Sequence, residues 1–199
     1  MELNTEIITA VALGIGLAAS AGFRVFVPML VASVAAHFGI FPVQEGFAWL
    51  ASWPAMISFG TATVLEIVAY YVPFVDNLLD SVTTPMAVGA GTLLLTSVLP
   101  IDNNMLKWMT GFIIGGGIAA TVQGGSVLAR LASSTLTGGT GNPAVATGEH
   151  AAAVSTSLLS LVIPFIVVSV LLVLIIILLV FFRKKFFRGR SSLQKRPLS

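Results

Sequence analysis

Long apolar stretches with very few charged residues dominate the chain. A helix that crosses a bilayer core about 30 Å thick needs roughly 20 apolar residues, because each helical residue advances the chain by about 1.5 Å. Five stretches come close to this length or exceed it: residues 7–38, 47–72, 82–99, 106–136 and 151–182. The pattern therefore predicts an all-α fold, a polytopic transmembrane helical bundle of about five spans.

Some of these stretches contain residues that interrupt a regular span. Residues 7–38 are long enough for more than one span, and small residues around Gly22 and a proline at Pro28 divide them. Residues 151–182 contain Pro164. Proline removes a backbone donor and restricts the residue before it, so we expect broken helices at such places. If the first or last stretch splits into two spans, the predicted side of the N-terminus is reversed.

Composition separates an apolar body from a basic end. Hydrophobic residues make up 56% of the chain and charged residues 9%, whereas about a quarter of a soluble domain is charged. Seven of the ten basic residues follow residue 182, so residues 1–182 carry three basic against eight acidic side chains, a formal charge of −5. We predict one transmembrane domain at 1–182 and a disordered tail at 183–199. A body without a basic face also predicts no nucleic-acid partner.

The tail predicts an orientation. Lys and Arg near span ends favour the cytoplasmic side, and a basic segment beside a span suits an anionic leaflet. The C-terminus is therefore expected in the cytoplasm, in contact with membrane lipids. Five crossings counted back from it place the N-terminus outside and Lys107 in a cytoplasmic loop.

A short motif occurs twice. Residues 16–20, Gly-Leu-Ala-Ala-Ser, are similar to residues 117–121, Gly-Ile-Ala-Ala-Thr, and an arginine follows each copy. Small residues permit close helix packing, and this alone accounts for such patches. Alternatively, three crossings separate the copies, and residues 7–72 and 106–182 are inverted halves joined by the span at 82–99, as in transporters built from inverted repeats.

Charged side chains inside the apolar stretches are candidates for function. Arg24 and Glu66 lie well within the first and second stretches. An ionised group at the bilayer centre costs from about 3 to more than 10 kcal/mol, so such groups pair or line a wet cavity. One interpretation is an Arg24–Glu66 ion pair, or side chains that snorkel to the membrane interface. The other is that Arg24 and Arg130 bind an anion while Glu66, Asp76 or Asp80 accepts a proton.

Two carboxylates follow the second stretch at helical spacing. Pro73 favours the end of a span and the start of a new short helix, which would place Asp76 and Asp80 on one face. Magnesium or calcium needs more oxygen ligands than this pair supplies. Cysteine is absent, and His37 and His150 have no second ligand at metal-binding spacing. We therefore predict no metal site and no cofactor.

Residues 133–143 have the composition of a structured loop, with glycines, hydroxyls and a proline but no charge. Consecutive backbone N–H groups at such glycines can converge on an anion. One interpretation is an anion-binding loop beside Arg130, with the candidate residues Thr137, Gly138, Gly139 and Asn142. A plain outer loop is the alternative.

In order along the chain, these landmarks resemble a bacterial membrane-protein family known as domain-of-unknown-function family 4126. The resemblance covers residues 10–175, and it rests on three groups of residues: residues 18–24 with Pro28; Glu66 with 72–73 and 76–80; and Arg130 with 137–143 and Glu149. It implies a multi-pass protein of the bacterial inner membrane, and it supplies no activity because the function of the family is itself uncharacterised. The chain departs from the family pattern at Tyr70–Tyr71, Thr84 and His150, where the pattern has charged residues.

Two functions remain open. The first is a transporter or channel-like protein, with broken segments around residues 22–28 and 121–143 and a central site for an anionic or phosphorylated small molecule or a lipid head group. The second is a non-transporting membrane scaffold or lipid-interaction protein, and either could be a homo-oligomer. We predict no enzymatic activity, because no nucleophile accompanies the only acid pair. The candidate substrate-binding residues are Arg24, Glu66, Asp76, Asp80, Arg130, Thr137, Gly138, Gly139, Asn142 and Glu149.

Overall fold

The computed structural model describes residues 5–72, 75–174 and 176–177, without the side chains of residues 6, 76–78 and 80. This part of the chain contains helices and turns and no strand, which confirms the all-α prediction. The elements are α1 (Thr5–Ala21), α2 (Phe26–His37), the 3₁₀ helix η1 (Glu45–Ala51), α3 (Trp53–Ala69), α4 (Val75–Thr96), α5 (Asn104–Thr110), the π-helix η2 (Gly111–Gly116), α6 (Gly117–Thr137) and α7 (Asn142–Val162).

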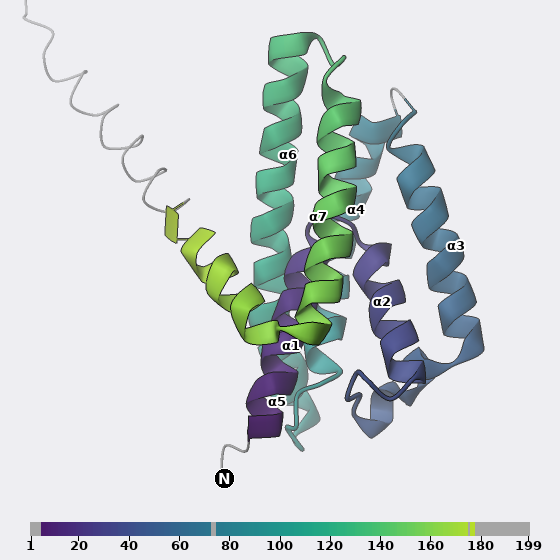
Figure 1. Ribbon diagram of the computed structural model, residues 1–199, viewed down its shortest axis with the longest axis vertical. Coiled ribbons are helices and arrows are strands. Elements are labelled where there is room, and N and C mark those ends of the chain that lie inside the picture. The colour runs from purple at the N-terminus through teal and green to yellow at the C-terminus, as the bar shows by residue number, and fades with distance from the viewer. Residues whose placement is uncertain (1–4, 73–74, 175, 178–199) are drawn as a thin grey trace, which may run out of the picture.

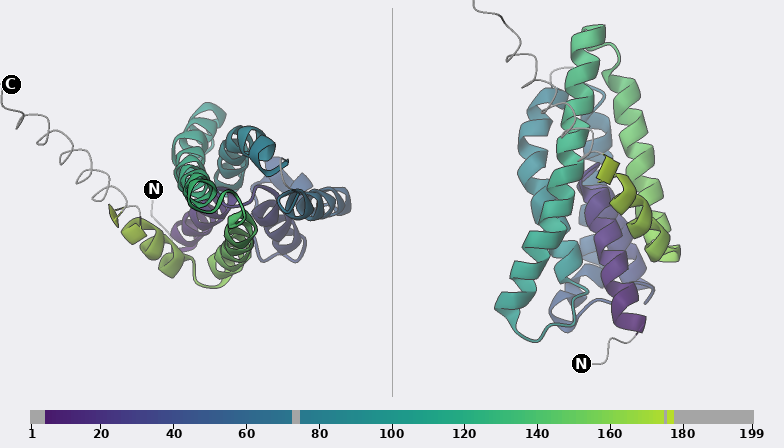
Figure 2. Two further views of the ribbon diagram at one scale, coloured as in Figure 1. Left: turned by 90° about the horizontal axis from the view of Figure 1, so that it is seen from above. Right: turned by 90° about the vertical axis from the view of Figure 1, so that its left-hand side faces the viewer.

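The helices form a bundle in which α3, α4, α6 and α7 run roughly along one axis (Figure 1). The apolar core lies where α1 meets α2 and α4, and it includes Leu17, Leu94 and Leu95, all fully buried. A further short helix, Pro164–Leu174, leaves the bundle at an angle, as Figure 1 and the left view of Figure 2 show. It follows the break that we expect at Pro164.

One continuous helical segment of the described chain, Asn104–Thr137, is long and apolar enough to cross a membrane. It combines α5, η2 and α6. The pair η1 and α3 is also long and apolar enough when taken together, but it is bent by 61° at the break between them, and α1 and α2 are shorter apolar helices. The topology of five spans and the division at residue 182 therefore stay predictions.

The first apolar stretch folds as two short helices. The start of α1 and the end of α2 lie at the same end of the bundle, and so does α5, which contains Lys107 (Figure 1). This arrangement does not agree with the five-crossing count, which put the N-terminus and Lys107 on opposite sides. The short helix predicted after Pro73 is also wrong in length. The chain there forms α4, a helix of 22 residues that continues through Pro85.

The break between α1 and α2 lies about halfway along the bundle, where α1 contacts α6 and α7 (Figure 1). A Cβ atom on Gly22 would lie 2.5 Å from the Cβ of Val122, so glycine is needed for this close approach to α6. The hydroxyl of Ser20 donates to the carbonyl of Ala153 at 2.8 Å, which ties α1 to α7. These contacts fix the following Arg24 inside the bundle.

The outer faces of the helices are apolar and several inner faces are polar. On α3, Leu65 is 64% exposed whereas Glu66 is 5% exposed, and on α6, Leu128 is 51% exposed whereas Arg130 is 5% exposed. Soluble proteins rarely expose large contiguous apolar surfaces. The outer surface of the bundle is therefore more apolar than is usual for a soluble domain, and part of its interior is polar.

Candidate functional site

Buried polar side chains from four elements meet near the break between α1 and α2. Thr63 and Glu66 on α3 and Tyr70 directly after its last residue recur three and four residues apart, so that they lie on one side of the helix. The buried face of α6 shows the same spacing. We call the group that contains both arginines the central polar cluster: Arg24, Glu66, Tyr70, Ser126, Arg130, Glu149 and His150.

Arg24 is 1% exposed, and its guanidinium group is held on several sides. Its Nε donates to Nδ1 of His150 at 2.6 Å, and its Nη2 lies 2.9 Å from Oε2 of Glu149. Nη2 also donates to the carbonyl of Ala146 at 3.3 Å, and Nη1 donates to the carbonyl of Phe23 at 2.8 Å. Burial of a charge is costly unless it is paired and hydrogen-bonded, and these contacts meet that condition.

Glu149 is shared by two guanidinium groups. Its Oε2 pairs with Nη2 of Arg24 and with Nη2 of Arg130. Nε of Arg130 lies 3.1 Å from Oε2 and 3.3 Å from Oε1, and Oε1 also accepts a hydrogen bond from the hydroxyl of Ser126. One carboxylate on α7 thus joins α6 to the break between α1 and α2.

Tyr70 lies under both arginines. The Cζ atoms of Arg24 and Arg130 are 3.8 and 4.1 Å from the centroid of its ring, within the range of a cation–π interaction. Its hydroxyl is 3.1 Å from Oγ1 of Thr83, which also accepts a hydrogen bond from the amide of Gln123 at 3.3 Å. The ring therefore lowers the energy of two cations that would otherwise repel each other.

Glu66 binds the backbone rather than Arg24. Its two carboxylate oxygens accept hydrogen bonds from the N–H groups of Val25 at 2.8 Å and Phe26 at 3.0 Å, at the N-terminus of α2. A helix begins with N–H groups that have no partner inside the helix and carries a partial positive charge there, so it attracts a carboxylate. Arg24 pairs with Glu149 instead, and the predicted Arg24–Glu66 ion pair is wrong.

His150 contributes a buried donor. Because its Nδ1 accepts from Arg24, we assign the ring proton to Nε2. This atom has no hydrogen-bond partner among the described residues, and neither has Oγ1 of Thr63. The rings of Tyr70 and Tyr71 lie 6.3 and 5.6 Å from the imidazole. A buried donor without an acceptor is costly, so a ligand that supplies an acceptor here gains a hydrogen bond.

Residues 133–143 form less of a loop than the composition predicts. Helix α6 continues to Thr137 and α7 begins at Asn142, so only residues 138–141 form a turn. The hydroxyls of Thr135 and Thr137 donate to the carbonyls four residues earlier, at 2.9 and 2.7 Å. Such bonds satisfy the hydroxyls inside a helix, which explains why the threonines do not break it.

This turn does not belong to the central polar cluster. Thr137 lies seven residues after Arg130 on α6, about 10 Å farther along the axis, and the turn residues Gly138 and Gly139 follow it. Both glycines have positive φ angles, +60° and +88°, as a tight turn requires. The amide of Asn142 donates to Ser134 at 3.0 Å and thereby links α7 to α6. The turn therefore does not lie beside Arg130, and anion binding by Thr137, Gly138, Gly139 and Asn142 stays a prediction.

The structure brings four of the predicted residues together: Arg24, Glu66, Arg130 and Glu149. The side chains of Asp76 and Asp80 lie outside the described residues. Sequence reasoning missed Tyr70, Ser126 and His150, although the helical spacing of Glu66 with Tyr70 and of Ser126 with Arg130 could have indicated the first two. Among the residues that the structure describes, no group of three His, Cys, Asp or Glu side chains is arranged to hold a metal ion.

The comparisons identify the family. The domain of unknown function DUF4126 matches residues 11–184, so the chain belongs to this family, and the resemblance seen in the sequence is confirmed. No curated protein and no solved structure matches the chain.

Proposed function

We propose that this chain is a small integral membrane protein, a transporter or channel-like protein that binds an anionic or phosphorylated solute at the central polar cluster. The observation that carries the proposal is the pair of buried arginines, Arg24 and Arg130, which share Glu149 inside a bundle with an apolar outer surface. Polar and ionisable groups inside a membrane are costly, and they commonly mark the path of a substrate or ion.

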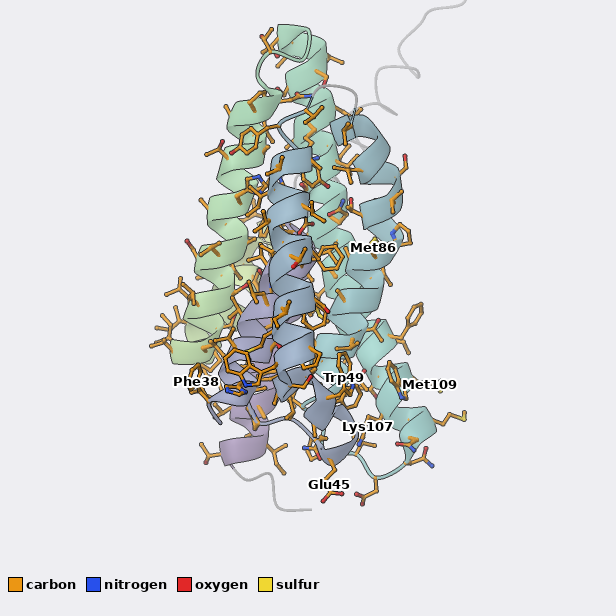
Figure 3. All side chains as sticks on the ribbon, turned by 90° about the vertical axis from the view of Figure 1, so that its right-hand side faces the viewer. Phe38, Glu45, Trp49, Met86, Lys107 and Met109 are labelled. Atoms are coloured by element: carbon orange, nitrogen blue, oxygen red, sulfur yellow. The ribbon has the colours of Figure 1, made fainter. Side chains whose placement is uncertain are left out.

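Several features support the membrane location. The segment Asn104–Thr137 is long enough to span, and exposed hydroxyls on the outer faces bond to carbonyls of their own helix, as at Thr61 and Thr121. Trp49 lies near one end of the bundle, where Glu45 and Lys107 also lie (Figure 3). Tryptophan near charged groups is typical of a membrane interface.

The course of the polar faces supports transport. The buried face of α6 carries Gln123, Ser126 and Arg130, and the buried face of α7 carries Glu149 and Ser157, so polar side chains follow the interior of the bundle. α1 and α2 together form a broken helix, and the N-terminus of α2 lies at the central polar cluster. Broken helices whose N-termini face a central site bind anionic substrate groups in several transporter folds.

Flux through liposomes tests the proposal. We expect purified protein in vesicles to move phosphate or a small carboxylate, and we expect Arg130→Gln to abolish the flux. Lys107→Gln removes the same charge from α5, outside the cluster, and serves as the matched control. The proposal fails if the wild-type protein moves neither anion, or if folded Arg130→Gln transports as the wild type does. Thermal unfolding in detergent shows whether each variant is folded.

The basic residues after 182 support a second candidate, a scaffold that binds anionic lipid without transport. These residues lie outside the described part of the chain. Truncation after residue 182 is expected to release the protein from partners or lipids that the tail holds, while the central polar cluster remains intact. Unchanged binding to vesicles that contain anionic lipid would exclude this role of the tail.

A further inference from the structure

We propose that Glu149 is a built-in occupant of an oxyanion site, and that the solute is a carboxylate or phosphate that takes the place of its side chain. The inference rests on the proposed function and names the chemistry of the ligand and the way it is admitted. In this arrangement the protein without solute holds its own carboxylate between the arginines, and the solute exchanges with it.

The donors around Glu149 define the shape of the ligand. Nη2 of Arg24, in the break between α1 and α2, and Nε and Nη2 of Arg130 with the hydroxyl of Ser126, on α6, converge on its two oxygens. A guanidinium group presents parallel N–H donors that match a pair of oxygens fixed on one atom. The set therefore recognises a group with at least two acceptor oxygens, which carboxylates and phosphates have and a halide ion lacks.

Both arginines have contacts that do not depend on Glu149. Arg24 is fixed by Nδ1 of His150 and by the carbonyls of Ala146 and Phe23, and both arginines lie over Tyr70. Glu149 reaches the donors through its own side chain, and in the proposed exchange this side chain turns away while α7 stays in place. Rotation of this one side chain thus leaves a preformed group of donors, and a preformed site loses little free energy to ordering when it binds.

Electrostatics favours replacement of the Glu149 carboxylate by a solute anion over a site that holds no anion. Two buried guanidinium groups over one ring repel each other, and removal of the partner of a buried charge is strongly destabilising. When Glu149 leaves, a second anion compensates this cost. We therefore expect the carboxylate of Glu149 and the solute to compete for the same donors.

Replacement of the side chain by a free anion tests this inference. Full-length Glu149→Ala is purified in detergent, and its Tm is measured with formate, acetate, phosphate or chloride at matched ionic strength. We expect a Tm below that of the wild type, and a saturable rise with formate, acetate or phosphate that recovers at least half of the loss. Acetate or formate acting alone identifies a carboxylate site, and phosphate acting alone identifies a phosphate site.

Ser157→Ala is the matched control. Ser157 is fully buried on α7 and lies 2.6 Å from the hydroxyl of Ser20, so its loss also destabilises the bundle but removes no charge. We expect its Tm to respond to the anions only as the wild type does. The inference is overturned if Glu149→Ala gains no more from any oxyanion than Ser157→Ala does, or if chloride acts equally well.

The inference can be tested even if Glu149→Ala folds poorly without an added anion. Glu149→Ala can be purified in formate or phosphate from the start, and if no folded protein is obtained in either anion the inference fails, because the added anion should replace the carboxylate. Saturable rescue without flux in liposomes overturns the proposed transport and leaves the anion site. Flux by the wild type without any rescue overturns only the present inference.

Discussion

Arg24 and Glu149 form a buried ion pair with 2.9 Å between Nη2 and Oε2, although one residue lies in the break between α1 and α2 and the other on α7. The pair stabilises the conformation in which the broken helix faces the cluster. Since Glu149 also pairs with Arg130, a change at any of the three residues alters the environment of the other two. We therefore expect their mutational effects to be strongly non-additive.

The ring of Tyr70 is predicted to stabilise both arginines. Tyr70→Phe keeps the ring and loses only the contact between the hydroxyl and Thr83, whereas Tyr70→Leu also loses two cation–π interactions. Each such interaction contributes about 1–2 kcal/mol when it is desolvated. We expect the leucine variant to unfold at a clearly lower Tm than the phenylalanine variant in detergent. Equal Tm values for the two variants would show that the ring has no such role.

Glu66 is predicted to stabilise the start of α2. Glu66→Gln leaves one carbonyl oxygen for the two N–H groups of Val25 and Phe26 and removes the charge that faces the helix N-terminus. We expect a loss of about 1–3 kcal/mol in stability and faster hydrogen exchange at these two amides. The matched control is Glu45→Gln on exposed η1, with an expected change within about 0.5 kcal/mol. Unchanged exchange at Val25 and Phe26 would contradict the prediction.

From the sequence, the burial of a polar residue can be predicted more reliably than the residue that it contacts. The high cost of a charge in an apolar stretch correctly directs attention to Arg24 and Glu66, because that cost depends only on local composition. The partner of each depends on how the helices pack. Arg24 meets α7 only because Gly22 and Ser20 bring α1 against its neighbours, and these long-range contacts leave no periodic signal in one sequence.

The prediction at residues 133–143 fails for a different reason. Threonine and serine are poor helix formers in water, so their frequency favours a loop. On α6 the hydroxyls of Thr135 and Thr137 bond to their own helix, and composition alone cannot indicate this. His150 is missed because a single histidine carries no spacing signal, and Tyr70 is missed because aromatic residues near span ends are also typical of interfaces.

An arginine scan of α6 tests the apolar outer face. Leu128 and Leu136 are both exposed, 51% and 85%, but Leu136 is one residue from the end of the helix. An arginine near the bilayer centre costs about 2.5–3.5 kcal/mol to insert, and less toward the interface where the side chain can reach water. We expect Leu128→Arg to reduce the amount of protein recovered from membranes strongly, and Leu136→Arg to reduce it little. Equal recovery of both variants would contradict a membrane around α6 at Leu128.

The contact between α4 and η2 is predicted to be the most sensitive to a single methyl group. A Cβ on Gly91 would lie 2.6 Å from the carbonyl oxygen of Gly115 and 2.7 Å from the Cβ of Ala119, whereas a Cβ on Gly89 would have no atom within 4 Å. Backbone atoms cannot move aside as a side chain can, so Gly91→Ala forces the helices apart at a cost of about 1–3 kcal/mol.

Gly89→Ala is the matched control because it lies on the same helix, two residues earlier. Alanine is the better helix former by about 0.8–1 kcal/mol, so we expect this variant to be neutral or slightly more stable. Thermal unfolding of both variants in detergent measures the difference. A Tm for Gly91→Ala at or above that of Gly89→Ala would show that the two helices do not pack backbone against backbone.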